Sequence, residues 1–320
     1  MSLKQHLKFE VYEPTLHHNL AKSLFELSFQ KTLPDTLWHW KTQTMRGVGL
    51  CAFLDGRMVA FFGGMPREFI YQDRSFMFLQ LCDVMVHPKT RGILSRKGAF
   101  TLTGNTFLDI FMHPQGEFLS GFGFPNERAL RIGEISGLYK AIDIIWEYAW
   151  TANPKTDLFY KTKQIQKENQ RLQQRYQKSV DAFVKRTWEY VVGDKSWGFI
   201  NKRYLEHPTF EYQLIECCSW PYPSVYALAK PLNSTRLEIV DLIGTIKGFS
   251  CAIDNLRGWA YARGYKTVSG WFSESLTPWL LPCNQIQQVC RVPKPKQHGM
   301  PWTESMNGKM SLMAGDTDFK

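Results

Sequence analysis

The stretch from Leu79 to His113 constrains the fold of this chain more than any other part. It begins with an apolar run that is typical of a buried strand and ends at Pro88. A basic loop around Gly92 and Gly98 follows, and apolar residues then recur near helical spacing. The pattern therefore predicts a strand, a basic glycine-containing loop and the start of a helix.

Such a loop and helix start can bind an anion, because backbone N–H groups point at the ligand and the helix dipole favours negative charge. The dipole contributes only about 0.3–2 kcal/mol. Several amides and basic side chains would therefore have to hold a pyrophosphate together. The alternative is an ordinary strand-to-helix turn with solvated Lys and Arg side chains.

The size and charge of the chain agree with a folded protein that binds an anion. With 320 residues it can form two domains. Lys and Arg exceed Asp and Glu by 39 − 29 = 10, and the pI is near 9.2. This excess suits a nucleotide cofactor, an acidic glycan, nucleic acid or a membrane surface, and does not choose among them.

The cysteines and the hydropathy exclude several classes of protein. The seven Cys residues contain no CxxC pair, and Cys217 and Cys218 are adjacent, which is poor metal spacing. We expect reduced thiols in a cytoplasmic protein. No apolar run is long enough for a membrane span, no signal-peptide core is found at the N-terminus, and no metal-ligand spacing occurs.

The first half of the chain predicts a mixed α/β (α+β) sheet with helices on both faces. Asp55-Gly56 predicts a tight hairpin turn. The expected strands are 8–14, 48–54, 58–65, 69–72, 76–86, 117–124 and 138–148, and the expected helices are 17–31, 34–42, the segment after Gly98, and 126–136.

The helix from Asn126 to Leu138 carries a family signature. Its Asn126, Ala129, Ile132, Glu134, Gly137 and Leu138 stand at the spacing of the second signature of the GNAT acyltransferase superfamily, which this stretch resembles. Gly133 stands where the family usually has Tyr. The alternative is an amphipathic helix closed by a glycine C-cap at Gly137.

The basic loop resembles the family's pyrophosphate loop less closely. Val84, Val86, Arg91 and Gly92 resemble its lead-in, but Leu94 stands where a glycine is expected. The second glycine comes only at Gly98. The pyrophosphate cradle could therefore be formed by Arg91 and Gly92 or by the segment Arg96, Lys97 and Gly98, and both alternatives stay open.

The resemblance implies a GNAT mechanism, in which acyl-CoA lies between two splayed parallel strands. Those strands would be 79–86 and 117–124 here. Backbone groups near Val84 and Val86 would bind the pantetheine and stabilise the oxyanion. Asn126, next to the matched Ala129, would bond the pantetheine arm, although Asn at a helix start is also an ordinary N-cap. The acceptor would attack directly, and a base would remove its proton.

Two side chains are candidates for proton transfer. Asp83 is an ionisable residue in an apolar strand and is the candidate base; the alternative is a carboxylate paired with a nearby Lys or Arg. In relatives the Tyr at the position of Gly133 protonates the departing thiolate, and Tyr139 could substitute for it. Without that Tyr, the question whether the protein catalyses acyl transfer at all stays open.

The second half of the chain predicts a second, degenerate GNAT-like domain. We expect domains at 1–150 and 193–320, joined by a polar helical connector at 151–192. Strands are expected at 210–217, 225–229, 237–243, 267–272 and 310–314, and helices at 197–205, 248–263 and 276–281. The loop 244–248 lacks the pyrophosphate pattern, so this copy would shape the acceptor cleft or a dimer surface. An unrelated α/β domain is the alternative.

The expected function is transfer of an acetyl or acyl group from acetyl-CoA or another acyl-CoA to an amine. The acceptor would be a small molecule such as an amino sugar or another cell-envelope precursor, and nucleic acid is not expected as a partner. A homodimer is compatible with this reading. One alternative is a Fem-type aminoacyl transferase, which takes its acyl group from tRNA. Another is a GNAT-like binding or regulatory protein without turnover.

Overall fold

The computed structural model describes two compact units. It covers residues 7–91, 98–113, 115–154, 162–165, 170–219, 222–296 and 301–317. The first unit consists of 1–68, 76–142 and 291–305, and the second of 69–75, 143–290 and 306–320. The chain thus interleaves between the units, whereas the sequence predicted contiguous ranges.

The first unit is built on a sheet in the order β1-β2-β3-β4-β5. β1 pairs with β2 and β2 with β3 in antiparallel register, whereas β4 and β5 are parallel. Asp55 and Gly56 have φ values of 49° and 75°, which confirms the tight turn expected there. The strands are β1 (Leu7–Val11), β2 (Val48–Leu54), β3 (Arg57–Tyr71), β4 (Arg74–Val86) and β5 (Ser120–Phe122).

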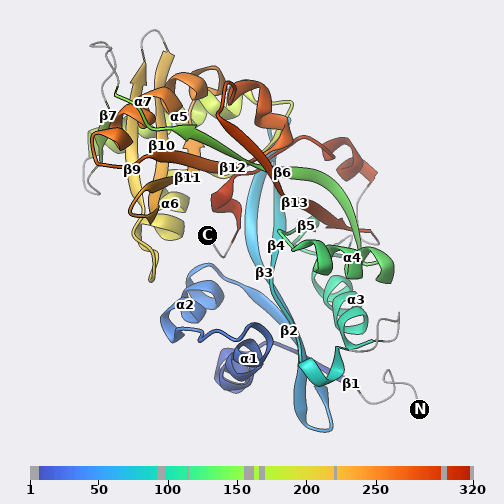
Figure 1. Ribbon diagram of the computed structural model, residues 1–320. Helices are drawn as coiled ribbons and strands as arrows, with labels where there is room; N and C mark the ends of the chain where they lie inside the picture. The colour runs from blue at the N-terminus through green and yellow to red at the C-terminus, as the bar shows by residue number, and fades with distance from the viewer. Residues whose placement is uncertain are drawn as a thin grey trace. The chain divides into compact units, whose positions relative to one another are not determined.

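Helices cover both faces of this sheet, as expected (Figure 1). α1 and α2 pack on one face, where Trp38 lies in a core cluster with Met58 and Phe61. α3 packs on the other face, where Phe107 lies in a cluster with Phe62. The helices are α1 (Pro14–Phe29), α2 (Asp35–His39), α3 (Ala99–Phe111) and α4 (Glu127–Ser136), and a π-helical turn, η2 (Trp40–Thr44), continues α2.

The second unit contains a sheet in the order β13-β6-β12-β11-β10-β9-β7. β9, β10 and β11 are antiparallel neighbours, and β11 and β12 are parallel. Its strands are β6 (Tyr139–Thr151), β7 (Thr162–Gln164), β9 (Gln213–Ser219), β10 (Tyr222–Asn233), β11 (Arg236–Ile243), β12 (Thr267–Ser273) and β13 (Gln285–Pro295), and outside this sheet β8 (Val191–Gly193) pairs with β14 (Met310–Ser311).

The order of elements in the second unit repeats that of the first. α7 (Phe249–Tyr261) connects the parallel strands β11 and β12, as α3 connects β4 and β5. α7 packs on one face of the sheet, and α5 (Gln170–Arg186) and α6 (Trp197–Ile200) contribute Tyr176 and Ile200 to the core of the other face. A π-helical turn, η4 (Asn201–Leu205), follows α6 as η2 follows α2.

These sheets confirm the mixed α/β fold class. Three strand predictions need correction. The segments 58–65 and 69–72 belong to one strand, β3, and the strand expected at 310–314 is β14, which ends at Ser311 and is followed by the 3₁₀ turn η8 (Ala314–Asp316). β13 was not expected, because its first four residues are exposed and it contains two prolines, both of which weaken a strand pattern.

Candidate functional site

The short strand β5 pairs in parallel with only part of β4. Their pairing runs from Phe78 and Ser120 to Gln80 and Phe122. β4 continues to Val86, whereas β5 ends at Phe122. The strands are close where they pair, because a Cβ at Gly121 would lie 3.1 Å from the Leu79 carbonyl oxygen of β4. Beyond Gln80, β5 no longer covers this edge of β4.

Val84 and Val86 lie on the part of β4 that extends beyond its pairing with β5, and both are half-buried. The other edge of β4 remains attached to β3, since the His87 amide donates to the Val59 carbonyl over 2.8 Å. Val84 and Val86 thus lie in the strand expected from the sequence, and their role in binding the pantetheine stays a prediction.

The helix that follows β4, α3, begins directly after Gly98, where the sequence placed it, although Ser95 was the N-cap suggested by the sequence. Gly98 is the N-cap of α3, with extended backbone, and contributes no side-chain cap. No acidic residue stands in the first turn of α3. This end of the helix is therefore suited to an anion. Gly92, Arg96 and Lys97 lie outside the described residues.

Arg91 binds the protein's own backbone. Its Nε atom donates to the Val86 carbonyl over 2.8 Å, and its Nη2 atom donates to the Ser28 carbonyl over 3.0 Å. The side chain thus links Arg91 to the end of β4 and to the end of α1.

Asp83 forms a buried ion pair with Lys41 of η2. The Lys41 Nζ atom lies 2.8 and 2.9 Å from the two carboxylate oxygens, and each side chain is 7% exposed. Asp83 has φ 50°, a left-handed conformation that Asp tolerates better than most residues. Lys41 was not singled out from the sequence; a lysine within a short aromatic helix was the only signal.

α4 begins and ends with the caps that its sequence suggests. The Asn126 Oδ1 atom accepts from the Ala129 amide over 2.8 Å, and Gly137 closes the helix with φ 81°. Asn126 is exposed, and Ala129 is half-buried. The signature Glu134 lies 3.6 Å from the Arg291 guanidinium, which is the surface pairing that such a Glu often makes.

Tyr139 occupies the space beside Gly133. A Cβ at Gly133 would lie 2.0 Å from the Tyr139 Cδ2 atom and 2.7 Å from Cε2. The Tyr139 ring packs edge-on to Phe100, with ring centroids 6.3 Å apart. Burial raises the pKa of the Tyr139 hydroxyl above its usual value. The ring of Tyr139 therefore lies where the side chain of the family's Tyr would begin.

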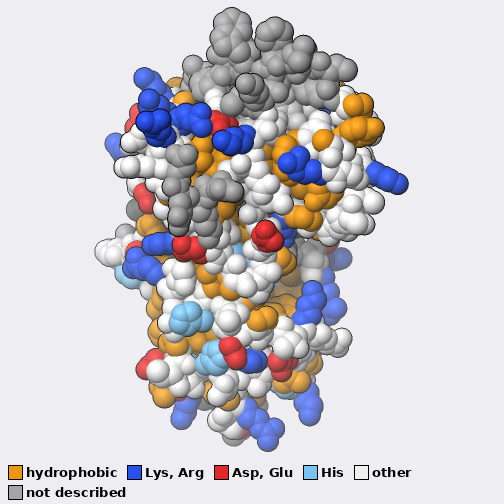
Figure 2. Space-filling view, turned by 90° about the vertical axis from the view of Figure 1, so that its left-hand side faces the viewer, with side chains coloured by type: hydrophobic (Ala, Val, Ile, Leu, Met, Phe, Trp, Pro, Cys, Tyr) orange, Lys and Arg blue, Asp and Glu red, His pale blue; other side chains and the backbone are white. Residues whose placement is uncertain are grey.

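The described part of the chain offers no group of three or more His, Cys, Asp or Glu side chains that could hold a metal ion. Its helices include none that is long and apolar enough to cross a membrane. On the face shown in Figure 2, Lys and Arg side chains are interspersed with Asp and Glu, apart from a group at the upper left.

The fold matches solved structures, although no family model and no curated protein matches the sequence. A protein of Enterococcus faecalis, named as a probable N-acyltransferase, aligns with a TM-score of 0.66 and 10% identity over 90% of this chain and 72% of its own. A GCN5-related N-acetyltransferase of Kribbella flavida aligns with a TM-score of 0.63 and 13% identity, covering 91% and 71%.

A third match is a GCN5-related N-acetyltransferase of Anabaena variabilis, with a TM-score of 0.60, 14% identity and coverage of 90% and 72%. At these identities the likeness concerns the fold. The chain has the fold of GCN5-related N-acetyltransferases, as the resemblance of the Asn126–Leu138 segment implied.

Proposed function

We propose that this protein is an acyltransferase that moves an acetyl or acyl group from acyl-CoA to an amine by direct attack. One observation carries the proposal. The pairing of β4 with β5 ends at Gln80 and Phe122, and β4 continues to Val86, which packs in the same core cluster as Ala99 at the start of α3. This is the arrangement in which the strand backbone could bind a pantetheine arm and the helix start could bind a pyrophosphate.

In this proposal Tyr139 is the acid that protonates the departing thiolate. Its ring lies beside Gly133, and a tyrosine hydroxyl is protonated at neutral pH, as a general acid must be. The Tyr139→Phe variant keeps the ring and loses the hydroxyl. We expect its kcat to fall by about 10²-fold or more, with little change in Tm.

Asp83 is the proposed base, and Lys41 holds its carboxylate in place at the open end of β4. Removing one member of a buried ion pair leaves a charge uncompensated, which can unfold a protein without touching its chemistry. The combined variant Lys41→Met with Asp83→Asn removes both charges. A folded double variant that still turns over at the wild-type rate would exclude Asp83 as the base.

Cofactor binding is the first test. A ligand present at 100 times its Kd stabilises the folded state by about 2.7 kcal/mol. We expect acetyl-CoA and desulfo-CoA to raise the Tm and tRNA to leave it unchanged. Arg96→Ala should weaken the CoA effect, whereas Arg74→Ala, which removes the same charge from the exposed start of β4, should not.

Turnover is the second test, and it separates the enzyme from a binding protein. Free thiol released from acetyl-CoA is measured across a panel of small primary amines, amino sugars included. The absence of Tyr at position 133 favours a binding or regulatory protein as the second candidate. CoA binding without thiol release for any amine would support that candidate, and stabilisation by tRNA alone would support the Fem-type reading.

A further inference from the structure

The second unit also contains two parallel strands whose pairing ends before the longer strand does. β11 and β12 pair from Arg236 and Thr267 to Ile239 and Gly270. Both strands continue beyond this point, β11 to Ile243 and β12 to Ser273. The gap between them is the counterpart of the gap between β4 and β5, in which the first unit is proposed to hold acyl-CoA.

A segment of the protein itself contacts both of these separating strands. We call residues Met310–Thr317 the C-terminal strap. On the β12 side, the Ser273 amide donates to the Leu312 carbonyl over 2.9 Å, and the Leu312 amide donates to the Ser273 hydroxyl over 3.1 Å. On the β11 side, the Leu242 amide donates to the Met313 Sδ atom over 3.2 Å. The strap therefore bridges β11 and β12 where their own pairing has ended.

The strap is buried along its length. Leu312, Met313 and Ala314 are each 0% exposed. A Cβ at Gly315 would lie 2.1 Å from the Tyr204 hydroxyl oxygen, so the backbone there has no room for a side chain. A ligand between β11 and β12 would have to displace these fully buried apolar groups.

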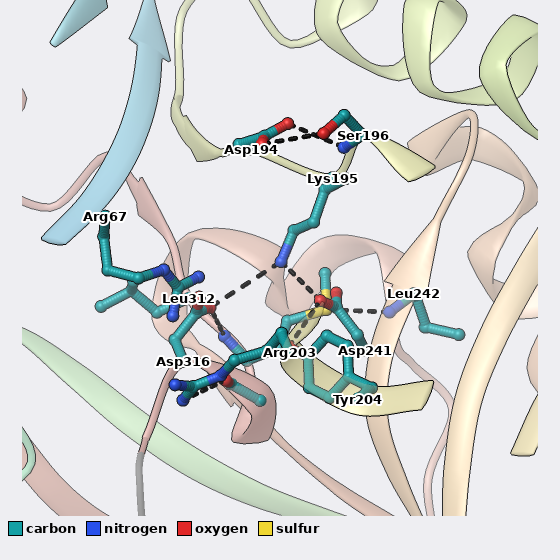
Figure 3. Close-up of polar contacts among 12 residues, drawn as sticks. Arg67, Asp194, Lys195, Ser196, Arg203, Tyr204, Asp241, Leu242, Leu312 and Asp316 are labelled. Atoms are coloured by element: carbon teal, nitrogen blue, oxygen red, sulfur yellow. Dashed lines mark hydrogen bonds and ion pairs between the residues drawn. The ribbon is translucent and has the colours of Figure 1, made fainter. Parts of the chain in front are cut away.

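Charged side chains hold the end of the strap (Figure 3). The Arg203 Nη2 atom donates to the Gly315 and Thr317 carbonyls over 3.1 and 2.7 Å. The Lys195 Nζ atom lies 2.6 Å from an Asp241 carboxylate oxygen and 4.0 Å from one of Asp316. All of these side chains are buried.

Each unit has a buried Lys–Asp ion pair just past the paired part of its strand, with the lysine on a different element: Lys41 lies in η2, whereas Lys195 precedes α6. In the first unit Asp83 lies three residues beyond Gln80, the last residue of β4 that pairs with β5, and Lys41 binds it. In the second unit Asp241 lies two residues beyond Ile239, and Lys195 binds it. In the second unit the strap supplies a further carboxylate, Asp316, to this site.

We propose that the C-terminal strap is an internal ligand of the second unit, which takes the place that the pantetheine arm of acyl-CoA would take in the first. Each chain then binds one acyl-CoA, in the first unit. The number of bound cofactors rests on the proposed function, whereas the occupancy of the second unit by the strap does not.

Hydrogen exchange measured by mass spectrometry tests the strap on the wild-type protein. We expect peptides from 310–317 to exchange as slowly as those of the buried strand β11, with no change on adding acetyl-CoA. Fast exchange of these peptides, or exchange that accelerates with acetyl-CoA, would overturn the proposal. Gly315→Leu should raise their exchange at least tenfold, whereas Gly198→Ala, at a glycine with open space, should not.

Native mass spectrometry with acetyl-CoA tests the stoichiometry. One bound cofactor per chain, lost in Arg96→Ala, supports the proposal. Two bound cofactors, or one that protects β11 and β12 from exchange, would overturn it. No bound cofactor together with a protected strap would refute the proposed function and the stoichiometry, but would still support the strap as the occupant of the second unit. If Gly315→Leu does not fold, the hydrogen exchange of residues 310–317 in the wild-type protein alone tests the strap.

Discussion

The pair Gly133 and Tyr139 shows how a departure from a family signature can be read in physical terms. A glycine inside α4 would ordinarily weaken the helix by about 1 kcal/mol relative to alanine. Here the missing side chain makes room for the ring of Tyr139, which packs against the helix. The glycine and the tyrosine therefore act as one unit, and neither position can be interpreted alone.

This coupling predicts the effect of Gly133→Ala. The added Cβ would lie 2.0 Å from the Tyr139 ring, so we expect the variant to lose about 1–3 kcal/mol of unfolding free energy. In a Tyr139→Ala background the same change should cost little or should stabilise. Chemical denaturation of the four proteins of this double-mutant cycle gives the coupling energy.

The control is Gly198→Ala, because nothing lies within 4 Å of a Cβ at that position. It should be neutral or slightly stabilising. If Gly133→Ala were as harmless as this control, the ring of Tyr139 would not occupy the place assigned to it.

Asp143 predicts a second effect at the scale of single residues. This carboxyl is 7% exposed, and burial raises its pKa to about 6, with a smaller contribution from Glu274. Because the pKa is higher in the folded than in the unfolded state, the stabilisation is complete below about pH 4. It is lost as the pH rises through about 6.

The Asp143→Asn variant removes this titration. When its unfolding free energy is subtracted from that of the wild type, the pH-dependent contributions of the other carboxylates cancel. Between pH 7.5 and pH 4 we expect the difference to shift in favour of the wild type by about 2 kcal/mol. A difference that stays constant over this range would show that Asp143 titrates normally.

At the scale of elements, the sequence predicted the features that depend only on residues close together in the chain. Asp55-Gly56 predicted its turn, and Asn126 and Gly137 predicted the two ends of α4. The parallel order of β4 and β5 was implied by the family resemblance and not by the local pattern. Helix propensity and helix capping depend on a few neighbouring residues, so both can be recognised in a single sequence.

Features that depend on tertiary contacts were missed or left open. Lys41 and Asp83 are 42 residues apart, and nothing near either residue indicates the other. The strand expected at 310–314 ends at Ser311, because the following residues are held by Ser273 and Leu242. The sequence left Arg91 and Arg96 as equal candidates, and only the contacts with Ser28 and Val86 show that Arg91 binds backbone.

The N-cap of α4 predicts an effect at this scale. Asn126→Ala removes the bond to the Ala129 amide, and loss of such a cap costs about 1 kcal/mol. Asn126→Ser should retain the cap and most of the stability. Thermal unfolding without cofactor measures the cap, and CoA titration of the stable Ser variant shows whether the Asn amide also binds the pantetheine. Equal stability of the Ala and Ser variants would contradict the capping role.

At the scale of the whole molecule, two units share one order of elements but differ at the point where their parallel strands separate. In the second unit the C-terminal strap bridges the strands. In the first unit β4 extends past its pairing with β5 to Val86, which packs in the same core cluster as Ala99 at the start of α3. The net charge of +10 is consistent with an anionic cofactor such as CoA and does not identify the acceptor.

The central claim is that acyl-CoA binds between β4 and β5, and a crystal structure with millimolar CoA tests it most directly. The account predicts density for the pantetheine beside Val84 and Val86, beyond the last paired residues Gln80 and Phe122, with the pyrophosphate at the start of α3. Density for CoA between β11 and β12, or none in the first unit at saturating CoA, would contradict it.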